Sequence, residues 1–137
     1  MSGENESLIA RLVGLHGEGG LAPTATDWRR IFDVAGDGPL TVVNLLGFRA
    51  VTGEQAYHRY TRATAGAFER AGGELLYFGT VAHAFGLGDH GDWDAVIVTR
   101  YPSARALADM WLDDDFIAAH THRHAAVTRS RVLVSAA

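Results

Sequence analysis

Polar and aromatic side chains flank a short apolar run in the stretch "GDWDAVIVTRYPS", residues 91–103. The run at 95–99 is typical of a buried strand, in which alternate side chains share a face. Asp94 then shares a face with Arg100, and Trp93 points the other way. A carboxyl group in an apolar cavity has a raised pKa, which makes Asp94 a candidate general acid or base. The alternative is that Asp94 ends the strand in water and that Trp93 belongs to the core.

His83 is the second candidate for proton transfer, because a neutral imidazole accepts a proton near neutral pH. The alternation in "ELLYFGTVAHAFG" predicts one long strand over 74–86, with His83 on the same face as Tyr77 and Val81. A lone histidine among apolar neighbours is also typical of a hydrogen-bonded core residue. His83 can act as a base only if its face of the sheet looks into a pocket.

Three further polar side chains interrupt apolar patterns and are candidate substrate ligands. Tyr57 and Tyr60 fall on the apolar stripe of a helix predicted over 52–73. Their phenols either pack in the core or hydrogen-bond a bound carbonyl or hydroxyl group. Asn44 lies inside an apolar strand predicted over 40–48, and its amide needs partners, either in the sheet or on a ligand.

The run "HTHRH" places His120 and His124 one helical turn apart, where both could bind one metal ion. A metal site needs more ligands than these two, and the sequence has neither another zinc pattern nor HExxH. We therefore predict no metal site, and we treat His120 as a candidate substrate contact near a solvated helix end. The chain lacks the glycine patterns of dinucleotide and phosphate loops, so we expect no cofactor. It also has no cysteine, which excludes a cysteine nucleophile.

These residues need a scaffold, and the apolar pattern predicts an α+β fold. Two short helices come first, so we expect a helical extension over 1–38 and one domain over 39–137. From residue 40 the expected order is strand, helix, strand, strand, helix, strand. This is the ferredoxin-like order, an antiparallel four-stranded sheet with its helices on one face. Beyond the elements already given, we predict a strand within 91–103, helices over 104–112 and 116–127, and a strand over 129–136.

The second expected strand carries apolar side chains on both faces. Leu75 and Tyr77 lie on one face, and Leu76 and Phe78 lie on the other. An antiparallel sheet with one open face normally alternates apolar and polar residues. Apart from the N-terminal helices, no remaining element is large enough to cover the second face. We therefore predict a homodimer that packs sheet on sheet.

Composition restricts the class of partner. The chain has 12 basic and 16 acidic side chains and a net charge of −4, which argues against a nucleic-acid partner. No apolar run is long enough to cross a membrane, and the acidic N-terminus does not fit a signal peptide. We therefore expect a cytoplasmic protein that binds a small molecule.

The order of motifs resembles a known family. The succession "VNLLGF", "YHRY", "WDAVIVTRYPS" and "MWLDDDFIAAHTHR" is similar to the domain-of-unknown-function family 1330, in the dimeric α+β barrel superfamily. The resemblance spans residues 40–135 and implies a small-molecule pocket between sheet and helices. It also falls on Arg123, whose guanidinium would hold a carboxylate or enolate oxygen. The residues before 40 lie outside it, either as a lid on the pocket or as part of a dimer contact.

Together these observations favour a cofactor-independent enzyme of specialised metabolism that acts on a hydrophobic carbonyl-bearing or aromatic metabolite. The chemistry would be isomerisation, cyclisation or dehydration by proton transfer, with cofactor-free oxygenation as a variant. His83 or Asp94 would take the proton, and Arg123 would hold the oxyanion. The substrate-binding candidates are Asn44, Tyr57, Tyr60, Trp93 and His120. The alternatives are a non-catalytic ligand-binding or stress-related dimer, and a haem or metal handler that uses His83 or the "HTHRH" run.

Overall fold

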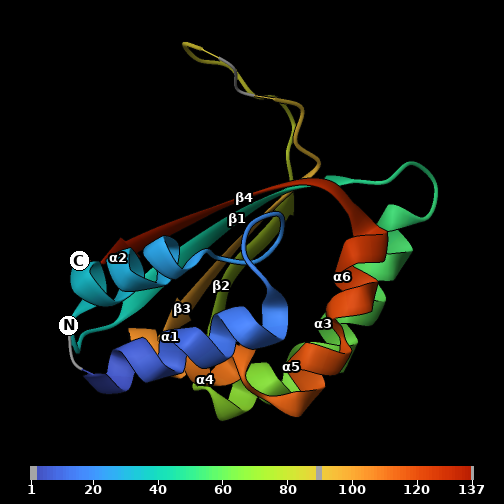
Figure 1. Cartoon of the computed structure of the whole chain (residues 1–137). Helices are drawn as coiled ribbons and strands as arrows, with labels where there is room; N and C mark the ends of the chain where they lie inside the picture. The colour runs from blue at the N-terminus through green and yellow to red at the C-terminus, as the bar shows by residue number, and fades with distance from the viewer. Residues whose placement is uncertain (1–2, 89–90, 137) are drawn as a thin grey trace.

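Two N-terminal helices precede a four-stranded sheet and a further set of helices (Figure 1). The computed structural model describes residues 3–88 and 91–136. The elements are α1 (Gly3–His16), α2 (Ala25–Ala35), β1 (Leu40–Phe48), α3 (Gly53–Arg70), β2 (Glu74–Thr80), β3 (Ala95–Tyr101), α4 (Ala104–Trp111), α5 (Asp114–Ala118), α6 (His120–Ala126) and β4 (Val127–Ala136). From β1 onward this is the predicted order, with the last helical region divided into α4, α5 and α6. Within the described ranges, no helix is both long enough and apolar enough to cross a membrane.

The four strands form one antiparallel sheet in the order β2-β3-β1-β4. Val42 of β1 lies opposite Thr99 of β3 and Val134 of β4. These three side chains share the face on which the helices pack. Val43, one residue along β1, points to the opposite face. The predicted ferredoxin-like α+β fold is confirmed.

Side-chain caps set where two of the helices begin. The Thr24 hydroxyl accepts the backbone N–H of Asp27, and the Asp27 carboxylate accepts that of Thr24, a capping box that starts α2. The Ser103 hydroxyl accepts the N–H of Ala106 and starts α4. Because α4 begins so soon after β3 ends, the chain turns directly from the sheet into the helix layer.

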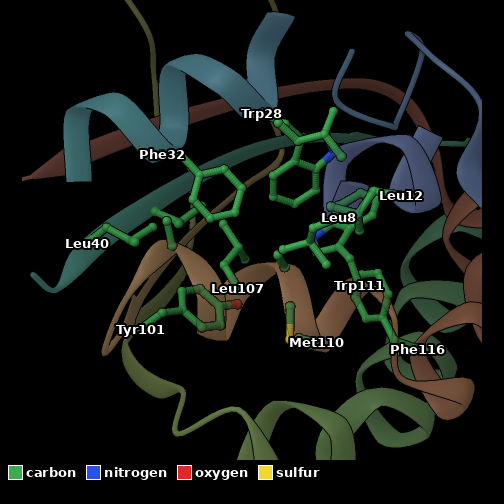
Figure 2. Close-up of a cluster of buried hydrophobic side chains, with 14 of the residues drawn as sticks. Leu8, Leu12, Trp28, Phe32, Leu40, Tyr101, Leu107, Met110, Trp111 and Phe116 are labelled. Atoms are coloured by element: carbon green, nitrogen blue, oxygen red, sulfur yellow. The ribbon is translucent and has the colours of Figure 1, made fainter. Parts of the chain in front are cut away.

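The N-terminal helices belong to the main hydrophobic core (Figure 2). Trp28 of α2 is 1% exposed, and its ring meets that of Trp111 of α4 edge-to-face with 5.8 Å between centroids. Leu12 of α1 and Leu40 of β1 lie in the same cluster. The extension therefore packs on the helix side of the sheet, and it does not supply a cover for the opposite face.

That opposite face, which we call the outer face, is apolar and reaches solvent. In the strand register Tyr77 lies opposite Val98, and Leu133 lies opposite Val43. Tyr77 is 55% exposed and Leu133 is 52% exposed. An exposed apolar sheet face of this kind is typical of an interaction surface.

The predicted strand over 74–86 is wrong in length, because β2 ends at Thr80. The last pair that joins β2 to its neighbour β3 is Thr80 with Ala95, and beyond it one hydrogen bond runs from the Val81 N–H to the carbonyl oxygen of Asp94. Alternating apolar residues favour extended backbone, but a strand also needs a partner for its hydrogen bonds. The described parts of residues 81–94, which we call the arm, project away from the sheet (Figure 1).

Candidate functional site

A cavity of about 890 Å³, which we call the hollow, lies between the sheet and the helices. The sheet contributes residues of its helix-side face, and the helix layer contributes residues of α2, α3, α4 and α6. The loop at 20–23 closes part of the wall, so the N-terminal extension forms a side of the hollow. Most of the lining is apolar. The polar side chains in it include Asn44, Tyr57, Tyr60, Thr99 and Arg123.

Arg123 brings a buried positive charge to the wall of the hollow. Its side chain comes from α6 and is 5% exposed. Nη1 donates a hydrogen bond of 3.0 Å to the carbonyl oxygen of Leu21, and the guanidinium carbon lies 5.9 Å from the ring centroid of Trp111. Among the described residues, no aspartate or glutamate forms an ion pair with it. The guanidinium therefore has donors left for an anionic group in the hollow.

Tyr57 and Tyr60 of α3 place two phenols near this guanidinium. Their ring centroids are 5.4 Å apart. Burial raises the pKa of both phenols, and the nearby charge of Arg123 opposes that rise only in part. Both groups therefore stay protonated at neutral pH and can donate a hydrogen bond. No protein partner for either hydroxyl is found within the described part of the chain.

The sheet adds two polar groups that also face the hollow. Asn44 lies opposite Ile97 of β3 and Val132 of β4, and no side-chain hydrogen bond holds it within the described ranges. The hydroxyl of Thr99 is buried in the same region, close to the phenol of Tyr101 on the same strand face. Sequence reasoning missed Thr99, although it is the one polar residue in the apolar run at 95–99.

Residues 45–137 match the family described as a domain of unknown function, DUF1330. The chain belongs to this family. The match includes α3 and α6, which carry Tyr57, Tyr60 and Arg123, and it leaves out the N-terminal helices that wall the hollow. No curated protein matches this DUF1330 chain.

Solved structures share the fold of this DUF1330 chain. A protein of unknown function from Rhodopseudomonas palustris is 29% identical, with a TM-score of 0.77 over 88% of this chain and 98% of its own. A Caulobacter crescentus protein named "putative antibiotic biosynthesis monooxygenase" is 15% identical, with a TM-score of 0.57 over 77% of this chain and 95% of its own. A dimeric ferredoxin-like protein of unknown function from Thermobifida fusca is 14% identical, with a TM-score of 0.51 over 75% and 94%. The last two show the fold alone.

His83 does not lie where the sequence places it. It follows the end of β2, on the exposed arm, where its ring stacks on that of Phe85 at 6.3 Å. It is absent from the described lining of the hollow. The strand assignment fails because the pairing of β2 with β3 ends at Thr80, and only the bond from Val81 to Asp94 follows it. In the DUF1330 chain His83 is therefore not the base of the hollow.

Asp94 and Trp93 also lie outside the hollow, at the base of the arm. The Asp94 carboxylate accepts the backbone N–H of Phe48 at 2.7 Å, so it holds the end of β1. This is a structural role, close to the alternative reading of Asp94 as a strand end. Trp93 is half-buried, with the guanidinium of Arg129 5.2 Å from its ring centroid. It lines a second, smaller cleft.

His120 packs behind the wall of the hollow. Its ring centroid lies 4.7 Å from that of His124 and 5.3 Å from that of His16 of α1. Burial, and then the nearby charges of His124, Arg123 and His16, lower its pKa to about 4. Its Nδ1 is buried and unpartnered among the described residues. No group of three side chains in that part of the chain is arranged to hold a metal ion.

Proposed function

We propose that this protein binds a hydrophobic molecule through a carbonyl, enolate or carboxylate oxygen in the hollow, and that it catalyses proton transfer on that molecule without a cofactor. One observation carries the proposal: the Arg123 guanidinium is 5% exposed and lacks an acidic partner among the described residues. A buried charge without a counter-charge costs several kcal/mol of folding free energy. An oxyanion on the ligand would offset that cost, and the apolar walls would hold the rest of the molecule.

The chemistry follows from the donors that surround the ligand oxygen. When a proton leaves the carbon next to a carbonyl group, negative charge moves onto the carbonyl oxygen. Arg123 and the neutral phenols of Tyr57 and Tyr60 donate to that oxygen and stabilise the charge as it forms. Asn44 orients the substrate from the sheet side. Isomerisation, cyclisation and dehydration all proceed through such an oxyanion.

Glu69 of α3 replaces His83 and Asp94 as the proposed proton acceptor. Two carboxylates line the hollow in the described ranges, those of Asp27 and Glu69. The carboxylate of Asp27 already accepts the N–H of Thr24 at 2.9 Å, in the cap of α2. The side chain of Glu69 forms no hydrogen bond or ion pair within the described residues. It is thus the acid that is free to accept a proton at the rim of the hollow, but it lies nine residues beyond Tyr60 on α3, about 13 Å along the helix, so the proton would reach it through water molecules in the hollow.

The proposed functional unit is a homodimer. The outer face exposes Tyr77 and Leu133 by about half of their surface, and the N-terminal helices pack on the other side of the sheet. The Thermobifida fusca neighbour, which shares the fold, is described as dimeric. Packing of two outer faces against each other would bury these side chains and leave one hollow in each subunit.

A non-catalytic ligand-binding dimer is the second candidate. It is favoured by the absence of any histidine from the described lining of the hollow, and by the exposure of Glu69 to solvent. Such a protein would use Arg123 and the two phenols to hold an oxyanion without transferring a proton. Solvent deuterium separates the two functions, because only an enzyme exchanges the acidic hydrogen of the bound molecule.

Mass spectrometry of the natively purified protein tests the proposal. We expect a bound hydrophobic molecule with a carbonyl or carboxyl oxygen, which the variant Arg123→Met no longer retains. The Glu69→Gln variant should retain the molecule and lose hydrogen exchange in deuterated buffer. A protein that carries no such molecule, and that also fails to bind added aromatic carboxylates, would contradict the proposed function.

A further inference from the structure

A second cleft, of about 510 Å³, lies beside the hollow and carries a concentration of positive charge. Three arginines line it: Arg49 after β1, and Arg129 and Arg131 of β4. Neither an aspartate nor a glutamate lines it within the described ranges, and none of the three arginines forms an ion pair there. The chain as a whole is acidic, with a net charge of −4. Such a local excess of guanidinium groups suits an anion.

Two of the guanidinium groups are held in place by the protein. Nε of Arg49 donates to the carbonyl oxygen of His124 at 3.3 Å. The Arg129 guanidinium lies over the ring of Trp93 and crosses β1 at Gly47, where an added Cβ would come within 3.0 Å of Nη2. Glycine at this position leaves the room that the guanidinium needs. Side chains fixed in this way lose little conformational entropy when an anion binds.

The cleft is continuous with the hollow. The loop residues Gly20 and Leu21 line both, and so do Ser130 and Arg131 of β4. Leu21 is also the residue whose carbonyl oxygen accepts the hydrogen bond from Arg123. Arg129 and Arg131 lie on the same face of β4 as Leu133, and β4 is the edge strand of the sheet. A molecule with its carbonyl group at Arg123 would therefore pass this loop and the edge of β4 to reach the arginines.

We propose that this arginine cleft binds an anionic group, a phosphate or a carboxylate, at the far end of the ligand whose apolar body lies in the hollow. The substrate class is then an amphipathic carbonyl compound with an anionic tail. The link to the hollow rests on the proposed function, whereas the anion site itself rests on Arg49, Arg129 and Arg131. Arg123 holds the reacting oxygen, and the cleft sets the orientation and the length of the ligand.

Calorimetric titration of the full-length protein with octyl phosphate, octanol and inorganic phosphate tests this assignment. We expect octyl phosphate to bind at least about tenfold more tightly than octanol, since charge-assisted hydrogen bonds add to the same apolar contact. The variants Arg49→Gln and Arg131→Gln should lose most of that advantage and keep the affinity for octanol. Arg62→Gln, on the exposed side of α3, removes the same charge outside both cavities and should change neither affinity.

The outcomes separate the two proposals. If octanol binds and octyl phosphate binds no better, the cleft is not an anion site, although the hollow still accepts apolar ligands. If octanol does not bind while inorganic phosphate binds in an Arg49-dependent way, the cleft stands and the proposed function of the hollow fails. The assignment would be overturned if Arg123→Met bound octyl phosphate no more tightly than octanol while Arg49→Gln kept the wild-type preference for octyl phosphate. The assignment would also be overturned if light scattering showed that Arg49→Gln and Arg131→Gln are monomers, that wild type is a dimer, and that added phosphate leaves the wild-type mass unchanged.

Discussion

Nη1 of Arg123 donates a hydrogen bond of 3.0 Å to the carbonyl oxygen of Leu21, which lies 102 residues earlier in the chain. This bond joins α6 to the loop between α1 and α2, on the wall of the hollow. It uses one of the five N–H groups of the guanidinium and fixes the direction of the others. The N-terminal extension is therefore part of the site and helps to aim its buried charge.

Replacement of Arg123 by methionine separates ligand binding from stability. We expect the affinity for naphthoate, an aromatic carboxylate, to fall by at least about tenfold, because the charge-assisted hydrogen bonds are lost. The free energy of unfolding should change by less than about 1 kcal/mol, since removal of an unpaired buried charge offsets the lost bond to Leu21. Calorimetry and urea unfolding measure the two effects.

The matched control for this variant is Arg62→Met, which removes an exposed charge from α3. It should leave naphthoate affinity unchanged. The neutral naphthalene methanol should bind wild type and Arg123→Met equally. If naphthoate bound both forms with the same affinity, Arg123 would have no role in holding the ligand oxygen.

The hydroxyl groups of Tyr57 and Tyr60 should matter for the ligand and not for the fold. Because neither has a protein partner among the described residues, phenylalanine at each position should alter the free energy of unfolding by less than about 0.5 kcal/mol at pH 7. Ligand affinity should fall by about tenfold for each lost hydrogen bond. Tyr77→Phe, on the outer face, is the control and should change neither quantity.

The raised pKa values of these phenols also predict how ligand affinity and the free energy of unfolding depend on pH. A buried phenol that keeps its proton above its ordinary pKa of 10.0 remains a donor, so affinity should stay constant up to about pH 10. Burial also raises the pKa of Tyr101, to about 12. The folded state then holds protons that the unfolded state loses, and the free energy of unfolding should fall as the pH rises from about 10 to 12. A loss of affinity that begins near pH 8 would contradict this account.

Homodimer formation through the outer face should depend on Leu133. A glutamate there would place a charge in the apolar contact, and light scattering at micromolar concentration should then report a monomer. Val51→Glu adds the same charge in a fully exposed turn and should leave the dimer intact. If the wild-type protein were already monomeric under these conditions, the proposed sheet-on-sheet dimer would be contradicted.

Local sequence patterns predicted the fold well, because each element carries its own signal. The apolar stripe that contains Tyr57 depends on residues within a few helical turns of one another, and it lies where the pattern places it. Arg123 entered through the family resemblance, and it lies buried in the wall of the hollow.

The errors and omissions concern relations between distant segments. The alternation around His83 specifies extended backbone, but it does not reveal that the pairing of β2 with β3 ends at Thr80 and Ala95. The arginine cleft was missed because Arg49 and Arg129 meet only through the pairing of β1 with β4. Charge that is spread along a sequence gives no sign of where folding concentrates it.

His120 should make the protein sensitive to mild acid. Its pKa is lowered from 6.5 to about 4 by burial and then by the charges of His124, Arg123 and His16, so protonation is disfavoured in the folded state. The free energy of unfolding should therefore be highest above pH 6.5 and fall as the pH drops toward 4. Because the side chain is half-buried and solvent screens its charge, we expect the free energy of unfolding to fall by only roughly 1–2 kcal/mol over this range.

The variant His120→Phe checks this acid sensitivity. It keeps an aromatic ring against Trp111 and His16 and removes the titrating group, so unfolding curves at pH 7 and pH 5 should lie closer together than in wild type. His58→Gln, on the exposed side of α3, should leave the pH difference unchanged. If His120→Phe retained the full difference, another group would be responsible.

The N-terminal helices should be required for the folding of the whole chain. Trp28 is 1% exposed and contacts Trp111 of α4, so Trp28→Ala should lower the free energy of unfolding by about 3–5 kcal/mol. The matched truncation Val34→Ala, at an exposed site of α2, should cost less than about 0.5 kcal/mol. A chain that begins at residue 39 would expose the apolar surface around Leu40 and Leu107, and we expect it to aggregate or remain unfolded. Cooperative unfolding of that shortened chain with the wild-type midpoint would show instead that 1–38 is a separate unit, in conflict with the shared core.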